Sequence, residues 1–65
     1  MTYICVISSG STYAEYEVST RSAYKAALQF GRGEHGEQVS IYKGDKLISR
    51  AAWDCEQRHY YRCCI

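Results

Sequence analysis

The first two segments of the chain that are rich in apolar residues have the side-chain patterns of β-strands. From Thr2 to Ser8, apolar side chains occupy both alternating sets, which predicts a strand covered on both faces and therefore central in its sheet. From Thr12 to Ser19 the alternation is cleaner, with Tyr13 and two glutamates on the polar side. Gly10 and three serines separate the two segments. We therefore expect a hairpin whose second strand has one solvent-exposed face.

A short helix is predicted next. The hydroxyl-rich segment Ser19–Ser22 can accept the unpaired amides of a helix N-terminus, and alanines then follow at helical spacing up to about Phe30. Because the inner face is mostly alanine, this helix can lie close to a sheet, with Phe30 or Leu28 as the large packed side chain. Gly31 and Gly33 are expected to end the helix in left-handed conformations and to begin a mobile loop.

Two further strands follow the loop. Residues 38–43 alternate, Gly44-Asp45 fits a two-residue hairpin turn with glycine first, and residues 46–53 alternate again. In this last strand Leu47 falls in the set of Trp53, and Ile48 falls with Arg50 on the outer face. The tail, residues 54–65, alternates as a strand would but could also form a helix. Its Tyr-Tyr and Cys-Cys pairs and its terminal isoleucine favour a fifth strand.

These elements predict one α+β domain that comprises all 65 residues. The fold is an antiparallel sheet of four or five strands (ββαββ, with a fifth C-terminal strand if the tail is extended) and one short helix on one face. A helix of about ten residues is about 15 Å long, which is too short to cover five strands. The opposite face is therefore expected to be polar or to meet a partner.

Tyrosine is the most informative part of the composition. Seven of the 65 residues are tyrosine, and they fall on both sides of the predicted strands. A domain of this size buries only about 60% of the surface that its unfolded chain exposes. Tyrosine combines an apolar ring with a polar tip and is favoured where proteins contact partners. The uncovered rings therefore predict a contact surface.

Charge and hydropathy narrow the choice of partner. Eight Lys plus Arg against seven Asp plus Glu give a net charge of +1, so the whole molecule lacks the strong positive field of an electrostatic nucleic-acid binder. A nucleic-acid-binding patch of basic residues on one part of the surface is still compatible with this net charge. The apolar run at the N-terminus is too short for a signal peptide or a membrane span. We expect a cytoplasmic protein with no membrane partner.

The tail contains an aromatic and basic cluster, Arg58-His59-Tyr60-Tyr61-Arg62. Tyrosine rings can stack on bases or fill protein pockets, and arginine can bind phosphates or carboxylates. The same pattern fits an edge strand whose charged residues prevent sheet-to-sheet association. Protein contact, nucleic-acid contact and edge protection all remain open for this cluster.

The four cysteines are expected to be reduced thiols, because no secretion signal is recognised. Cys55, His59 and Cys63 are four residues apart, so on a helix they would form one stripe that, with Cys64 or Cys5, could bind zinc. On a strand each pair is about 13 Å apart, too far to share one ion. A disulfide from Cys5 to Cys63 or Cys64 requires the first and last strands to be neighbours.

No catalytic signature accompanies these residues. A cysteine with His35 or His59 and Asp45 or Asp54 supplies the residue types of nucleophilic catalysis without a local motif. The alternating glycines of residues 31–36 follow a helix, whereas a phosphate-binding loop precedes one. We therefore expect no enzymatic activity and no cofactor.

The segment Glu17–Ala27, followed by the Gly44-Asp45 turn and the strand that contains Trp53, resembles the short strand-strand-helix-strand-strand proteins of phages and mobile elements. That group includes several small anti-CRISPR proteins. The resemblance is an architectural pattern over residues 2–53, and it transfers no residue role. It implies a non-enzymatic inhibitor that binds a host protein complex and blocks a nucleic-acid site or a moving part.

The primary hypothesis is a small non-enzymatic binding protein that occludes a macromolecular partner, such as a bacterial defence complex. Homodimerisation through an uncovered sheet face or edge is a further expectation. The alternatives are a small nucleic-acid-binding module that uses the sheet and the basic tail, and a small zinc or thiol protein. The expected partner-binding residues are tyrosines and arginines, the residue types that anchor interface hot spots: Tyr13, Tyr42, Arg50, Arg58, Tyr60, Tyr61 and Arg62.

Overall fold

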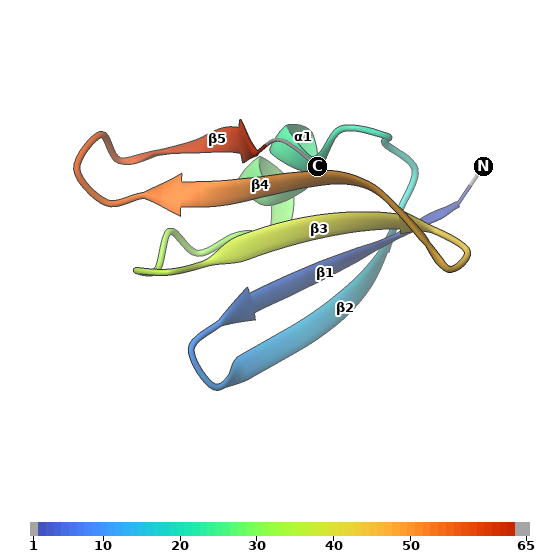
Figure 1. The fold of residues 1–65 in the computed structure, drawn as a ribbon, viewed down its shortest axis with the longest axis horizontal. Helices are drawn as coiled ribbons and strands as arrows, with labels where there is room; N and C mark the ends of the chain where they lie inside the picture. The colour runs from blue at the N-terminus through green and yellow to red at the C-terminus, as the bar shows by residue number, and fades with distance from the viewer. Residues whose placement is uncertain (1, 64–65) are drawn as a thin grey trace.

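The computed structural model describes residues 2–63 as one antiparallel sheet with a single helix on one face (Figure 1). The strands are β1 (Tyr3–Ser9), β2 (Thr12–Val18), β3 (Gln38–Lys43), β4 (Lys46–Asp54) and β5 (His59–Cys63), and the helix is α1 (Ala23–Phe30). The strand order is β2-β1-β3-β4-β5. The predicted ββαββ architecture is confirmed, and the tail forms the fifth strand.

β1 lies between β2 and β3, so its predicted place inside the sheet is confirmed. The prediction that both of its faces are covered was wrong, because no helix of the described residues lies over its second apolar set. Tyr3, Cys5 and Ile7 are buried in the core beneath the helix, whereas Ile4 and Val6 on the other face are half-buried. Because β2 and β3 are both antiparallel to β1, they run parallel to each other. α1 carries the chain from one side of β1 to the other (Figure 1).

The helix begins at the predicted hydroxyl-rich segment. The Ser22 side chain accepts a hydrogen bond from the backbone N–H of Lys25 at 3.3 Å, which satisfies one unpaired amide of the first turn. The inner face consists of Ala23, Ala26 and Ala27, all fully buried. Their small side chains let the helix backbone approach the sheet, where α1 packs over β1, β3, β4 and β5.

The helix end differs in part from the prediction. The Phe30 ring stacks on Tyr16 with ring centroids 4.5 Å apart, whereas Leu28 is 62% exposed and does not pack on the sheet. Gly33 has the predicted left-handed conformation, with φ of +69°. The prediction for Gly31 was wrong, because its φ of −71° is one that any residue adopts.

A register irregularity changes the faces at the start of β4. The Gly44-Asp45 turn forms as predicted, with Gly44 at φ of +63°. The pairing of β3 with β4 shifts just before Tyr42, so that Leu47 lies opposite Tyr42, and Ile48 packs against the core. Simple alternation predicted the opposite, with Ile48 on the outer face and Leu47 on the face of Trp53. The extra residue in β4 is the physical reason, because each one-residue slip moves a side chain to the other face.

Tyr60 is buried, with 5% of its surface exposed, so the prediction of an exposed ring at this position was wrong. Its hydroxyl donates a hydrogen bond to Glu37 Oε1 and accepts one from the Gly33 N–H at 2.9 Å. Its ring contacts Trp53 edge to face at a centroid distance of 4.8 Å. Tyr60 pairs with Trp53 across the β4–β5 ladder, which places both rings on the helix side. Alternation alone could not tell which face β5 presents to the helix.

In residues 2–63 no helix covers the other face of the sheet (Figure 1). We call this surface the open face and define it by the side chains that alternate away from the core: Ile4, Val6, Tyr13, Glu15, Glu17, Ser40, Tyr42, Leu47, Arg50, Ala52, Tyr61 and Cys63. The expectation that one short helix leaves a face uncovered is therefore confirmed for the described part of the chain. No helix among these residues is long and apolar enough to cross a lipid bilayer.

Candidate functional site

A hollow of about 390 Å³ lies on the open face and crosses β1. Its lining comes from β1, β2, β3 and the β3–β4 turn: Ile4, Val6, Tyr13, Glu15, Tyr42, Gly44 and Asp45. The two aliphatic side chains of β1 are half-buried, and Tyr13 is 66% exposed. The hollow therefore has an apolar floor between two tyrosines.

Strand register brings the lining residues together. Val6 pairs with Glu15 of β2, and Ile4 pairs with Tyr42 of β3. Tyr13 is two residues before Glu15, so both side chains lie on the same face of β2. The site therefore forms because β1 lies between β2 and β3. These two strands are separated in the sequence by α1, and β1 brings them together.

The hollow has an acidic lining. Glu15 and Asp45 are exposed carboxylates, and none of the described residues that line the hollow is a lysine or an arginine. The pKa of Tyr13 is raised, first by desolvation, then by the charge of Glu15 and the hydrogen bond to it, and last by Tyr42. These influences indicate that the two phenols and the Glu15 carboxylate lie close together on the sheet surface.

This combination matches the chemistry of a long basic side chain. Lysine and arginine have an aliphatic stem that packs on apolar surface while the charged end stays in water. Tyrosine faces attract cations, and carboxylates accept charge-assisted hydrogen bonds from ammonium and guanidinium groups. The hollow offers Ile4 and Val6 to the stem, Tyr13 to the cation, and Glu15 with Asp45 to the charge.

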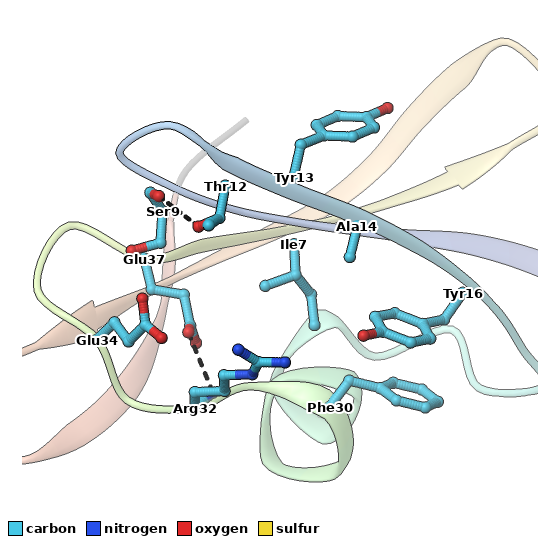
Figure 2. A pocket seen from close by; sticks show the side chains of 10 residues that line it. All are labelled: Ile7, Ser9, Thr12, Tyr13, Ala14, Tyr16, Phe30, Arg32, Glu34 and Glu37. Atoms are coloured by element: carbon cyan, nitrogen blue, oxygen red, sulfur yellow. Dashed lines mark hydrogen bonds between the residues drawn. The ribbon is translucent and has the colours of Figure 1, made fainter.

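A second cavity of about 380 Å³ lies on the helix side, beside β2. Figure 2 shows the stacked rings of Tyr16 and Phe30 at one end and the Arg32 side chain pointing toward Ile7. The Glu37 carboxylate, which is 1% exposed, is already engaged, because one oxygen accepts the Arg32 backbone N–H at 3.0 Å and the other accepts the buried phenol described above. Glu37 therefore holds the loop that follows α1, and this cavity is not the candidate site.

Four of the predicted contact residues lie on the open face. Tyr13 and Tyr42 line the hollow. Arg50 lies farther along the sheet on β4, where its Nε donates to the Ser40 hydroxyl at 3.4 Å. Tyr61 is 47% exposed on β5, opposite Ala52. The structure thus places these four side chains on the uncovered face, and their role in binding a partner stays a prediction.

The other three predicted contact residues lie elsewhere. Arg58 is in the β4–β5 turn, and Arg62 is on the helix side, where its Nη2 donates to the Ser22 hydroxyl at 3.4 Å. Tyr60 is buried. The basic cluster seen in the sequence is therefore divided between the turn, the helix side and the core. The described residues do not combine it with Arg50 into one basic surface.

The cysteines are separated by the fold. Cys55 lies in the β4–β5 turn, and His59 and Cys63 lie at opposite ends of β5, so the described residues form no group of three metal ligands. β3 and β4 lie between β1 and β5, which places Cys5 and Cys63 about 14 Å apart across the sheet, beyond disulfide reach. The condition that the first and last strands are neighbours is therefore not met. Cys64 lies outside the described residues.

Sequence reasoning missed several residues of the hollow. Ile4 and Val6 were recognisable as the second apolar set of β1, and Glu15 as a neighbour of Tyr13 on the same strand face. Asp45 had no such signal. It reaches the hollow because β3 pairs with β1, and that pairing joins segments that are distant in the sequence.

Comparison with protein-family models, curated protein sequences and solved structures finds no match to this chain.

Proposed function

We propose that this protein is a non-enzymatic binding module that holds a partner protein against the open face of its sheet. A lysine or arginine side chain of the partner occupies the hollow between Tyr13 and Tyr42. The observation that supports this proposal most is the hollow itself, in which an aliphatic floor, two phenol rings and two carboxylates line one space of about 390 Å³.

The charge of the lining selects the class of partner. An acidic side chain would meet Glu15 and Asp45, and like charges that approach each other in a contact are repelled. A purely apolar side chain would fill the floor and leave both carboxylates without a countercharge. A basic side chain satisfies both parts, and a cation above an exposed tyrosine contributes about 0.5–1 kcal/mol.

The open face also has room for the rest of an interface. A standard protein interface buries about 800 Å² on each partner, which is less than a fifth of the 4515 Å² surface of the described chain. Beyond the hollow, half-buried Leu47 and exposed Tyr61 extend the apolar and aromatic surface across β4 and β5. These residues provide the buried centre that tight binding requires.

Occlusion is the mode of action that fits a binding module of this size. A sheet face that carries a hollow can cover a site on a larger partner, and it needs no moving part. Inhibition of a host complex, such as a bacterial defence complex, is the role that the architectural resemblance implies, and it stays a prediction.

The first experiment tests the hollow with the acetylated methylamides of lysine and arginine. The probes are titrated into ¹⁵N-labelled protein, with the methylamide of acetylnorleucine as the uncharged control of similar length. We expect saturable shifts of the Glu15, Tyr42 and Asp45 amides with the basic probes alone. The Glu15→Gln/Asp45→Asn double variant should weaken this binding by about fivefold, because exposed ion pairs are each worth under 1 kcal/mol. Equal shifts with norleucine would contradict the proposal.

The second experiment tests the partner. A photo-crosslinking residue is placed at position 13 on the open face and, as a matched control, at position 28 on the outer side of α1, because Tyr13 and Leu28 are similarly exposed. We expect a partner protein to crosslink to position 13. This crosslink should be lost when the Glu15→Gln/Asp45→Asn changes are also present. Crosslinking to nucleic acid would support the nucleic-acid alternative in its place. A crosslink between two copies of the chain, together with a dimer in sedimentation, would show that the open face binds a second copy of the chain and not a different protein.

A further inference from the structure

The fold brings a thiol and an imidazole into contact away from the open-face hollow. His35 Nδ1 and Cys55 Sγ are 2.9 Å apart, and both residues are exposed. They line a surface cavity of about 400 Å³ together with the rings of Trp53 and Tyr61 and the acidic residues of the β4–β5 turn. Neither residue belongs to the lining of the hollow.

The turn that carries Cys55 is held by its own hydrogen bonds. The Asp54 side chain accepts the N–H groups of Glu56 and Gln57 at 2.9 and 3.2 Å, and its backbone oxygen accepts the Arg58 N–H at 2.7 Å. These bonds fix the backbone on both sides of the thiol. The sulfur therefore has a defined position rather than the freedom of an open loop.

The loop that carries His35 is tied to that turn. The Glu37 N–H donates to the Glu34 backbone oxygen at 3.0 Å, which closes the loop around His35. The Trp53 N–H then donates to the Glu37 backbone oxygen at 3.0 Å and joins the loop to the end of β4. The contact between imidazole and thiol is thus built by two braced segments that are distant in the sequence.

We propose that Cys55 is a thiol–disulfide exchange site for small organic disulfides, with His35 as its general base. The Cys55 S–H proton passes to His35 Nδ1, and the sulfur attacks one sulfur of the bound disulfide. A new S–S bond joins Cys55 to that sulfur, and the S–S bond of the small molecule breaks. The leaving thiolate takes the proton from His35. Cys55 is oxidised to a mixed disulfide and half of the small molecule is reduced to a thiol, so no further oxidant is required.

The surroundings distinguish Cys55 from the other described cysteines. Cys5 is fully buried, and burial raises the pKa of its thiol to about 11, which suppresses the reactive thiolate. Cys63 is half-buried in β5, beside Arg50 of β4. The second histidine, His59, directs its Nδ1 to the backbone oxygen of Tyr60 at 3.1 Å rather than to a thiol. Cys55 combines exposure, a base and an aromatic surface for an organic group.

The test uses freshly reduced full-length protein and glutathione disulfide as the probe. Samples are quenched with acid at intervals, and the modified cysteine is located by peptide mass mapping. At pH 7 we expect Cys55 to be modified about tenfold or more faster than Cys63, because a positioned base typically contributes at least that factor. The pH profile of the Cys55 rate should also differ from that of an unassisted thiol, because His35 removes the proton.

Two histidine variants separate assistance from simple exposure. His35→Gln should lower the Cys55 rate about tenfold and make it rise with pH as an unassisted thiol does. His59→Gln is the matched control and should leave the rate unchanged. Circular dichroism checks that both variants fold, and the pH profile of the unaltered protein tests the base independently of them. Modification of Cys63 or Cys64 at the rate of Cys55, or an unchanged rate and pH profile in His35→Gln, would overturn the proposal.

Discussion

The phenol oxygen of Tyr60 lies where a Cβ atom on Gly31 would have to be placed. The same Cβ would also lie 2.5 Å from the backbone oxygen of Ala27 and 2.6 Å from the Tyr60 ring. With φ of −71° and ψ of 153°, the backbone at Gly31 suits any residue, so the requirement for glycine is steric. It is imposed jointly by the last turn of α1 and by β5, the strand at the other end of the chain, which closes the core over the helix C-terminus.

We predict that Gly31→Ala lowers the free energy of unfolding by about 3 kcal/mol, the upper end of the usual cost of overpacking a core. The matched control is Gly10→Ala. Gly10 has φ of +58° and no atom near its would-be Cβ, so this change costs only the left-handed strain of about 1 kcal/mol. Urea denaturation of both variants measures the two costs. Equal destabilisation would show that Tyr60 does not restrict position 31.

Tyr60→Phe is predicted to destabilise the protein by about 2 kcal/mol at neutral pH, because the Gly33 N–H and the Glu37 carboxylate each lose a buried partner. Urea denaturation measures this loss. Tyr61→Phe is the control, because Tyr61 is 47% exposed and should tolerate the change.

The stability difference between the unaltered protein and Tyr60→Phe is also predicted to depend on pH. Burial, followed by the hydrogen bond to Glu37, raises the pKa of Tyr60 from 10.0 to about 12. The folded state therefore favours the neutral phenol, and this stability is fully present below pH 10 and is lost as the pH rises through 12. Over that window the stability of the unaltered protein should fall by about 2–3 kcal/mol relative to Tyr60→Phe, which is enough to remove its advantage over the variant. A constant difference would contradict the raised pKa.

Arg58→Gly is predicted to stabilise the protein by about 0.5–1 kcal/mol. Arg58 is the one described residue other than glycine with positive φ, at 58°, and glycine adopts this conformation without strain. Part of the gain is offset by the greater freedom of glycine in the unfolded chain. Thermal denaturation measures the change, with Arg58→Lys as a control that keeps the strain. A less stable Arg58→Gly variant would show that the arginine side chain stabilises the turn.

Cys5 is predicted to resist alkylation in the folded protein. Its pKa of about 11, raised from 9.0 by burial, keeps the thiol neutral, and this contribution to stability is present below pH 9 and is lost through pH 11. Iodoacetamide at pH 8 should modify Cys55 in the native protein and Cys5 only after urea is added, as shown by peptide mass mapping. Rapid native modification of Cys5 would mean that the core opens near β1.

Local patterns determined the elements of this protein. Apolar residues in both alternating sets of Tyr3–Ser9 indicated that β1 is not an edge strand, and the Ser22 hydroxyl and Gly44 marked a helix start and a turn. The alanine face of α1 indicated a helix that lies close to a sheet and leaves its other side open. These features depend on side-chain period and on backbone preferences of single residues, which a sequence states directly.

Only the tertiary structure decided which surfaces these elements form. The extra residue near Tyr42 exchanged the faces of Leu47 and Ile48, and the phase of β5 buried Tyr60 while it exposed Tyr61. The hollow, and likewise the contact of His35 with Cys55, join segments that meet through strand pairing. A two-residue period defines two faces of a strand, but the register between distant strands and the position of the helix determine which face becomes core and which residues meet.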